Sequence, residues 1–118
     1  LHVHGDGEPY DVHIVNRLPD KLRAHCFSAD DDLGFRTLDL SEDWNWHFRM
    51  ALFERTAFYC HFWWFAKQAG FAVFDSKISD YCGHSSTNEC NWEVREDGFY
   101  LFDRTAQSPK FFKANDWY

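Results

Sequence analysis

The chain has 118 residues, four cysteines and a formal net charge of −7, and Phe, Trp and Tyr make up 20% of it. A chain of this length forms one domain, and aromatic residues at this density favour strands over helices. Binding to nucleic acid or to an anionic membrane is not expected, because both need clustered Lys and Arg. Membrane insertion is not expected either, since no apolar run is long enough to span a bilayer.

The first two predicted strands lie before residue 28 and alternate apolar with polar side chains, as strands with one buried face do. Their apolar positions are Val12, Ile14, Leu22, Ala24 and Cys26. The turn between them contains Pro19. The two segments therefore predict a hairpin with Cys26 on its inner face.

Three consecutive carboxylates, Asp30, Asp31 and Asp32, follow this hairpin, and Gly34 ends the turn. Like charges side by side have no place in a packed core, so the turn must face solvent or a partner. The favoured interpretation is a turn whose Asp side chains accept hydrogen bonds from nearby backbone amides. A direct partner contact is the alternative, and both roles could hold for different members of the triplet.

The clearest period of two in the chain lies between residues 44 and 52 and predicts a strand with one buried face. Its apolar members are Trp44, Trp46, Phe48, Met50 and Leu52. The next strand, over residues 57–66, carries rings on both faces, which fits either a strand covered on both sides or one whose outer face is a binding surface. Its outer positions are Tyr59, His61, Trp63 and Phe65.

A sixth strand is expected from Gly70, followed by a polar surface loop pinned between Cys82 and Cys90. This loop is the second candidate contact region, through His84, Ser85, Ser86, Thr87 and Asn88. The Asp97-Gly98 dipeptide then predicts a closing hairpin, because Asp-Gly favours two-residue turns.

About eight short strands predict an all-β fold, an antiparallel two-layer β-sandwich, with a closed barrel as the alternative. The sandwich domain is expected over residues 11–104, after a mobile lead-in at residues 1–10 and before a strand-poor tail at 105–118 that packs back in part.

The even cysteine count favours two disulfides in an oxidising compartment. Three pairings are possible, and the expected strand order ranks Cys60–Cys82 with Cys26–Cys90 first. This pairing would bring the acidic turn and the 82–90 loop together. Neither a metal site nor a cofactor is expected, because no two histidines have the spacing of a helical zinc site. Enzymatic activity is not expected either, since no nucleophile elbow is present around Ser28.

Several short motifs together resemble the plant self-incompatibility S-protein homologue family over residues 12–102. They are His25-Cys26, Ser28, Asp30-Asp31-Asp32-Leu33-Gly34, a Trp-rich strand ending in Phe48, Thr56-x-Phe58-x-Cys60, Cys82, Cys90-x-Trp92 and Asp97-Gly98-Phe99-Tyr100. The resemblance implies a small secreted plant protein whose targeting peptide is absent from this chain. Some members act as stigma ligands that reject self pollen, and most have no assigned role. Glycosylation is not carried over, because the chain lacks a standard Asn-x-Ser/Thr sequon.

These observations predict a monomeric, extracellular recognition protein that binds the ectodomain of a plasma-membrane receptor through its loops. The acidic turn and the 82–90 loop are the expected contact regions. A carbohydrate-binding module is the alternative, in which Tyr59, Trp63 and Phe65 would stack on sugar rings.

Overall fold

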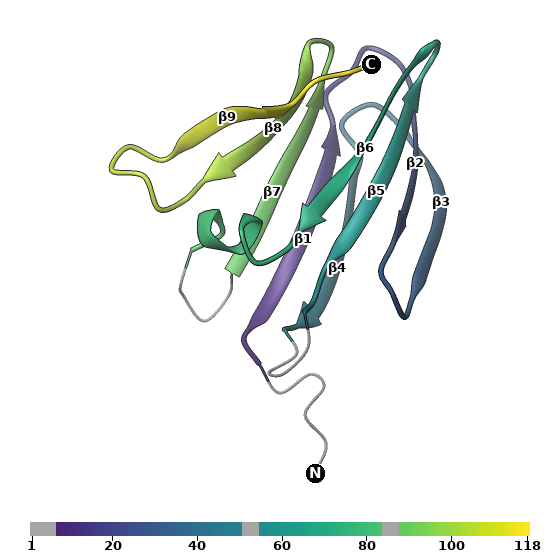
Figure 1. Ribbon diagram of the computed structural model, residues 1–118. Coiled ribbons are helices and arrows are strands. Elements are labelled where there is room, and N and C mark those ends of the chain that lie inside the picture. The colour runs from purple at the N-terminus through teal and green to yellow at the C-terminus, as the bar shows by residue number, and fades with distance from the viewer. Residues whose placement is uncertain (1–6, 51–54, 84–87) are drawn as a thin grey trace.

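The computed structural model describes residues 7–50, 55–83 and 88–118. Within these ranges the chain forms nine strands and one short 3-10 helix, η1 (Figure 1). The elements are β1 (Pro9–Asn16), β2 (Leu22–Phe27), β3 (Asp32–Leu38), β4 (Asp43–Arg49), β5 (Phe58–Trp64), β6 (Lys67–Phe74), η1 (Ile78–Tyr81), β7 (Asn88–Arg95), β8 (Gly98–Asp103) and β9 (Lys110–Asn115). The expected all-β sandwich with two disulfides is confirmed.

The strands form two sheets, one of five strands in the order β4-β1-β7-β8-β9 and one of four in the order β3-β2-β5-β6. All neighbours are antiparallel except β1 and β7, which run parallel with Val12 opposite Cys90. The predicted sandwich was antiparallel throughout, so this parallel pair was not expected. Antiparallel neighbours can be joined by a tight turn, whereas β1 and β7 are separated in sequence by the whole four-stranded sheet, so no hairpin sets their direction.

Both ends of the sandwich extend further than the sequence predicted. Tyr10 lies in β1 and is buried, so the fold begins before the expected boundary at residue 11. The tail expected to be strand-poor contains β9, which pairs with β8 at the edge of the five-stranded sheet. The end of the chain also reaches the other sheet, because Tyr118 and Gln68 exchange backbone hydrogen bonds of 2.8 and 3.0 Å (Figure 1). No residue of β9 is fully buried on either face, so its sequence lacks the apolar period of two from which the other strands were predicted.

Aromatic side chains from both sheets fill the core. Phe62 of β5 and Phe99 of β8 face each other with their ring centroids 5.0 Å apart, and Phe71 of β6 lies 5.2 Å from Trp92 of β7. The indole Nε1 of Trp92 donates a hydrogen bond of 2.9 Å to the carbonyl of Val73, so its polar atom is satisfied inside the core. The inner face predicted for residues 44–50 is confirmed, while Leu52 lies outside the described residues.

The disulfide pairing expected from the sequence is wrong. Cys26 is bonded to Cys60 and Cys82 to Cys90. Cys26 and Cys60 are directly opposite each other on the neighbouring strands β2 and β5. Helix η1 turns the chain out of the four-stranded sheet after β6, and this separates Cys82 from Cys60. The expected pairing treated β6 as the partner of β5, but β5 also pairs with β2 on its other side.

One buried polar side chain joins the connections at one end of the sandwich. The amide Nδ2 of Asn16 donates to the carbonyls of Asp20, Leu38 and Asp39 at 2.9 to 3.2 Å, and its Oδ1 accepts from the amide of Leu18. Asn16 is fully buried. The side chain therefore fixes the turn after β1 against the end of β3.

We expect Asn16→Leu to lower the free energy of unfolding by about 3 kcal/mol, because it leaves several backbone groups around the amide without partners. The corresponding fall in melting temperature is roughly 10 °C. Urea unfolding followed by tryptophan fluorescence measures the change. Asn45→Ala is the control, since among the described residues the Asn45 amide bonds only to Asp43, at the surface, and it should change stability by less than about 0.5 kcal/mol.

The two disulfides should contribute unequally, because they close chain segments of 34 and 8 residues. Loop-closure entropy predicts losses of about 4 kcal/mol for Cys26→Ala/Cys60→Ala and about 2.5 kcal/mol for Cys82→Ala/Cys90→Ala. Urea unfolding of both double variants tests this order. Peptide mapping of the unreduced protein checks the pairing itself, and a peptide linking Cys26 to Cys90 would contradict it.

Candidate functional site

The outer face of the four-stranded sheet carries a continuous group of rings. Because Ala24, Cys26 and Phe62 point into the core, the alternate residues of β2 and β5 point outward. Together with one residue of β3 they form what we call the aromatic face, which consists of His25, Phe27, Phe35, Tyr59, His61 and Trp63. The exposed fractions of Phe35, Tyr59 and Phe27 are 56, 45 and 37%. Large apolar side chains gathered on one exposed face mark interaction surfaces.

The rings of the aromatic face stack on one another across the strands. His25 and Phe35 lie opposite each other in register, with centroids 4.1 Å apart and planes inclined by 11°. His61 and Trp63 are 4.4 Å apart at 25°, and Phe35 reaches Trp63 at 6.1 Å and 20°. The broad faces of these rings are therefore turned toward one another.

Polar groups border the aromatic face on several sides. The guanidinium of Arg23 lies over the Phe35 ring at 5.1 Å from its centroid. His61 Nε2 lies 3.0 Å from Gln68 Oε1. These groups give the apolar surface a margin that can form hydrogen bonds, as protein interfaces commonly have.

The acidic turn joins the aromatic face at the end of β2. The Ser28 amide donates to the Asp31 carbonyl at 2.7 Å, and Ser28 Oγ accepts from the Asp31 amide at 3.0 Å, which closes the turn. An open hollow of about 400 Å³ lies between this turn and the rings of His25 and Phe27. The turn and the aromatic face therefore form one continuous surface.

The three carboxylates of the acidic turn differ in their partners. Asp32 Oδ1 accepts from the Gly34 amide at 2.9 Å and lies 2.8 Å from His25 Nε2. The bond from Gly34, followed by that from His25, holds the pKa of Asp32 below its usual value of 3.8. Within the described ranges no hydrogen bond or ion pair involves the carboxylates of Asp30 and Asp31. Asp32 thus has the local structural role expected of the turn, while Asp30 and Asp31 stay available to a partner.

The second predicted contact region differs from the first. Residues 84–87, which include His84, Ser85, Ser86 and Thr87, lie outside the described residues. Asn88 begins β7 and is fully buried, with its Nδ2 donating to Glu8 Oε2 at 3.1 Å and to the Pro9 carbonyl at 3.2 Å. Asn88 therefore ties β7 to the start of β1, and its expected contact with a partner is corrected.

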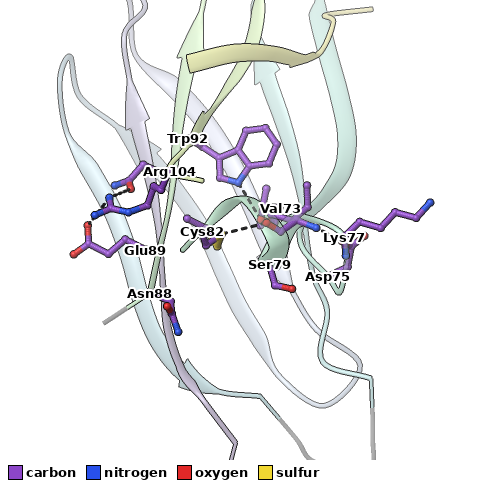
Figure 2. The surroundings of a disulfide bond; sticks show 12 residues. Val73, Asp75, Lys77, Ser79, Cys82, Asn88, Glu89, Trp92 and Arg104 are labelled. Carbon is purple, nitrogen blue, oxygen red and sulfur yellow. Dashed lines mark hydrogen bonds and ion pairs between the residues drawn. A yellow bond between two sulfur atoms is a disulfide. The ribbon is translucent and has the colours of Figure 1, made fainter. Parts of the chain in front are cut away.

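The disulfide between Cys82 and Cys90 belongs to the five-stranded sheet and its flanking helix. Figure 2 shows Trp92, Val73 and Cys82 packed beside η1, with the Cys82 Sγ contacting the Ile78 carbonyl at 3.2 Å. The acidic turn lies on the opposite side of the molecule, at the β2–β3 connection (Figure 1). The expected neighbourhood of the two regions, which depended on a Cys26–Cys90 bond, is therefore wrong.

Sequence reasoning found part of the aromatic face and missed the rest. It named Tyr59 and Trp63, which belong to it, and Phe65, which lies in the β5–β6 turn and contacts Trp64 instead. It missed the contribution of Phe27 and Phe35. Phe27 and Phe35 join the aromatic face because β2 pairs with both β3 and β5. The sequence of a single strand does not show which strands it pairs with.

Among the described residues, no helix is long and apolar enough to cross a membrane.

The fold is that of a small β-sandwich with two disulfides, and the outer faces of its two sheets carry different side chains. The model of the plant self-incompatibility protein S1 family matches residues 11–117, so the chain belongs to that family. The matched range includes β9 and Trp117, which lie beyond residues 12–102, the range that contains the motifs resembling the family.

Individual relatives agree with this membership. S-protein homolog 3 of Arabidopsis thaliana is 35% identical over 108 residues, which cover 90% of this chain and 71% of that protein. Self-incompatibility protein S1 of Papaver rhoeas is 34% identical over 100 residues, covering 82% of this chain and 70% of its own length. S-protein homolog 2 of Arabidopsis thaliana is 36% identical over 100 residues, and the match covers 62% of that protein.

We expect Asp32→Asn to lower the melting temperature near neutral pH and to have less effect in acid. The folded state depresses the pKa of Asp32 below 3.8, so its ionised form stabilises the fold above that value, and this contribution is lost as the pH falls through the depressed pKa. Thermal unfolding of both proteins at neutral pH and at an acid pH well below 3.8 measures the difference. Asp30→Asn is the control and should behave like the unsubstituted chain at both values. If Asp32→Asn lowered the melting temperature as much in acid as at neutral pH, the stabilisation would not come from the ionised form of Asp32.

Proposed function

We propose that this chain is a secreted recognition protein that binds a protein partner on the plant cell surface through the aromatic face and the acidic turn. Membership in the self-incompatibility protein S1 family supports a ligand role. The observation that carries the proposal is the exposed group of stacked rings beside two carboxylates that are unpaired within the described ranges.

The composition of this surface favours a protein partner. Tyr, Trp, Phe and Arg are enriched at the centres of protein interfaces, where they supply large contact areas at little cost in side-chain entropy. Phe35, Tyr59 and Arg23 provide these residue types on one face. Rings already stacked on one another lose little further freedom when a partner covers them.

The acidic turn favours a partner with positively charged side chains. Asp30 and Asp31 are exposed and make no ion pair with the described part of the chain, so their charges are free to meet a cation. Charge complementarity steers association and suppresses wrong partners more than it adds affinity. A partner segment rich in Lys or Arg, with apolar side chains next to it, fits this surface best.

The carbohydrate-binding alternative has less support. A sugar stacks on an open ring face, which presents the negative side of the aromatic quadrupole to its C–H groups. The rings of His25 and Phe35 instead cover each other at 4.1 Å, and Arg23 lies over Phe35. The exposed Phe65 lies in the β5–β6 turn, where its ring contacts Trp64, and it would offer a single platform outside the aromatic face.

We expect Phe35→Ala/Tyr59→Ala to weaken saturation binding of the labelled, oxidised protein to plant plasma-membrane vesicles by about tenfold or more, the loss typical of truncated interface aromatics. Leu40→Ala is the matched control, since Leu40 is 55% exposed but lies in the β3–β4 connection. Asp30→Lys/Asp31→Lys should also weaken binding, with a smaller effect at high salt.

Two outcomes would count against this proposal. Unchanged affinity of the Phe35→Ala/Tyr59→Ala variant, with the fold intact by circular dichroism, would exclude the aromatic face as the contact surface. Binding that survives protease treatment of the vesicles and is displaced by soluble glycans would favour the carbohydrate-binding alternative.

A further inference from the structure

The outer face of the five-stranded sheet differs in chemistry from the aromatic face and gathers ionisable groups from three strands. Asp11 and His13 are two positions apart on β1, and Glu89 on the parallel strand β7 lies directly opposite Asp11. Their chain neighbours Val12 and Cys90 are buried, so all three side chains point outward. One potential ligand atom of each residue lies within 4.8 Å of those of the other two.

We propose that Asp11, His13 and Glu89 bind a divalent transition-metal ion, with zinc as the best fit. One imidazole nitrogen with two carboxylate oxygens is a donor set that zinc accepts, and imidazole disfavours magnesium and calcium. Atoms around one zinc ion lie about 3.4 Å apart. Closing the site therefore needs a rotation of side chains, for which Glu89, with 37% of its side chain exposed, has room.

The residues around this cluster orient two of the proposed ligands. His13 Nδ1 lies 2.9 Å from Asp43 Oδ2 on β4, so in the neutral ring the proton sits on Nδ1 and the lone pair on Nε2. No hydrogen bond from the described ranges reaches His13 Nε2. A metal-bound histidine typically has this arrangement, with a carboxylate behind the ring that fixes its tautomer.

Asp11 has a supporting partner of the same kind. His47 Nδ1 on β4 lies 2.6 Å from Asp11 Oδ1, which holds that carboxylate in place and leaves its second oxygen free of any hydrogen bond within the described ranges. All three proposed ligands are half-buried, so the charges are only partly screened by water. The cluster contains Asp11, Asp43 and Glu89 and therefore attracts a cation when its histidines are neutral.

One cation lies at the margin of the site. Arg104 Nη1 is 3.9 Å from Glu89 Oε1 and donates to Asn91 Oδ1 at 3.3 Å (Figure 2). This distance is long for a salt bridge, and Asn91 holds the guanidinium to one side. Arg104 should weaken metal binding by repulsion without blocking it, so removing its charge should raise the affinity.

No metal site was expected from the sequence, because no two histidines have the spacing of a helical zinc site. In a sheet, ligands come instead from positions i and i+2 of one strand and from the register of its neighbour. The parallel pairing of β1 with β7 supplies the third ligand, and this pairing was not predicted. The site lies on a different sheet from the aromatic face, so it does not depend on the function proposed above.

Isothermal titration with zinc chloride tests this site. Because His2 and His4 could bind zinc on their own, every protein carries His2→Ala and His4→Ala and no histidine tag. We expect one saturable site. Affinity should fall about 10- to 100-fold in Asp43→Asn, which removes the group behind His13, and further in His13→Ala and Glu89→Gln. Arg104→Gln should bind zinc more tightly.

His25→Ala is the matched control, because His25 forms a similar pair with Asp32 on the other sheet. This variant should bind zinc with unchanged affinity.

Paramagnetic broadening by manganese chloride then locates the ion. The amide signals of His13 and Asn91 should broaden, while that of Gly70 on β6 should not. Absence of saturable zinc binding would overturn the proposal. Equal affinity of the unsubstituted, His13→Ala and Glu89→Gln chains, each with an intact fold, would also overturn it, and so would equal losses in His13→Ala and His25→Ala.

Discussion

The parallel pairing of β1 with β7 is the contact on which the rest of the molecule depends. It joins β1, with its neighbour β4, to the closing strands β7, β8 and β9 in one sheet, while the four strands of the other sheet all lie between β1 and β7 in the sequence. The same register buries Asn88 at the start of β7, sets Cys90 opposite Val12 and places Glu89 beside Asp11. Because β1 and β7 are far apart in the sequence, their pairing carries a large loop-closure entropy cost.

Local alternation and long-range pairing explain what the sequence could predict. The period of two is a property of a single strand, so the inner faces of β4 and β5 were predicted correctly from Trp44 and Phe62 and their neighbours. Strand order is a property of the whole sheet. The disulfides followed from it: Cys60 bonds to Cys26 because β2 is the second neighbour of β5. The short 3-10 helix η1, which turns the chain toward β7, left no signal in the alternation.

The candidate site also has features that could be predicted from the sequence and features that could not. The exposure of the acidic turn could be predicted because three adjacent charges cannot be buried. The separate role of Asp32 could not, since it requires the Gly34 amide and the ring of His25 around one oxygen. The rings of β5 were recognised as a possible surface, whereas the aromatic face exists only because β2 and β3 place Phe27 and Phe35 beside them.

The outer faces of the two sheets are built in the same way but carry different kinds of side chain. On each sheet the inward residues fix the core and the register, while the outward residues are held at set spacings without contributing much to the core. On one sheet these positions carry stacked rings with exposed carboxylates at their border, and on the other they carry His–Asp pairs such as His13 with Asp43. Because the outward positions are largely independent of the core, either surface can change in sequence while the fold is kept. A sandwich held by two disulfides can therefore keep one architecture while its outer surfaces diverge in sequence.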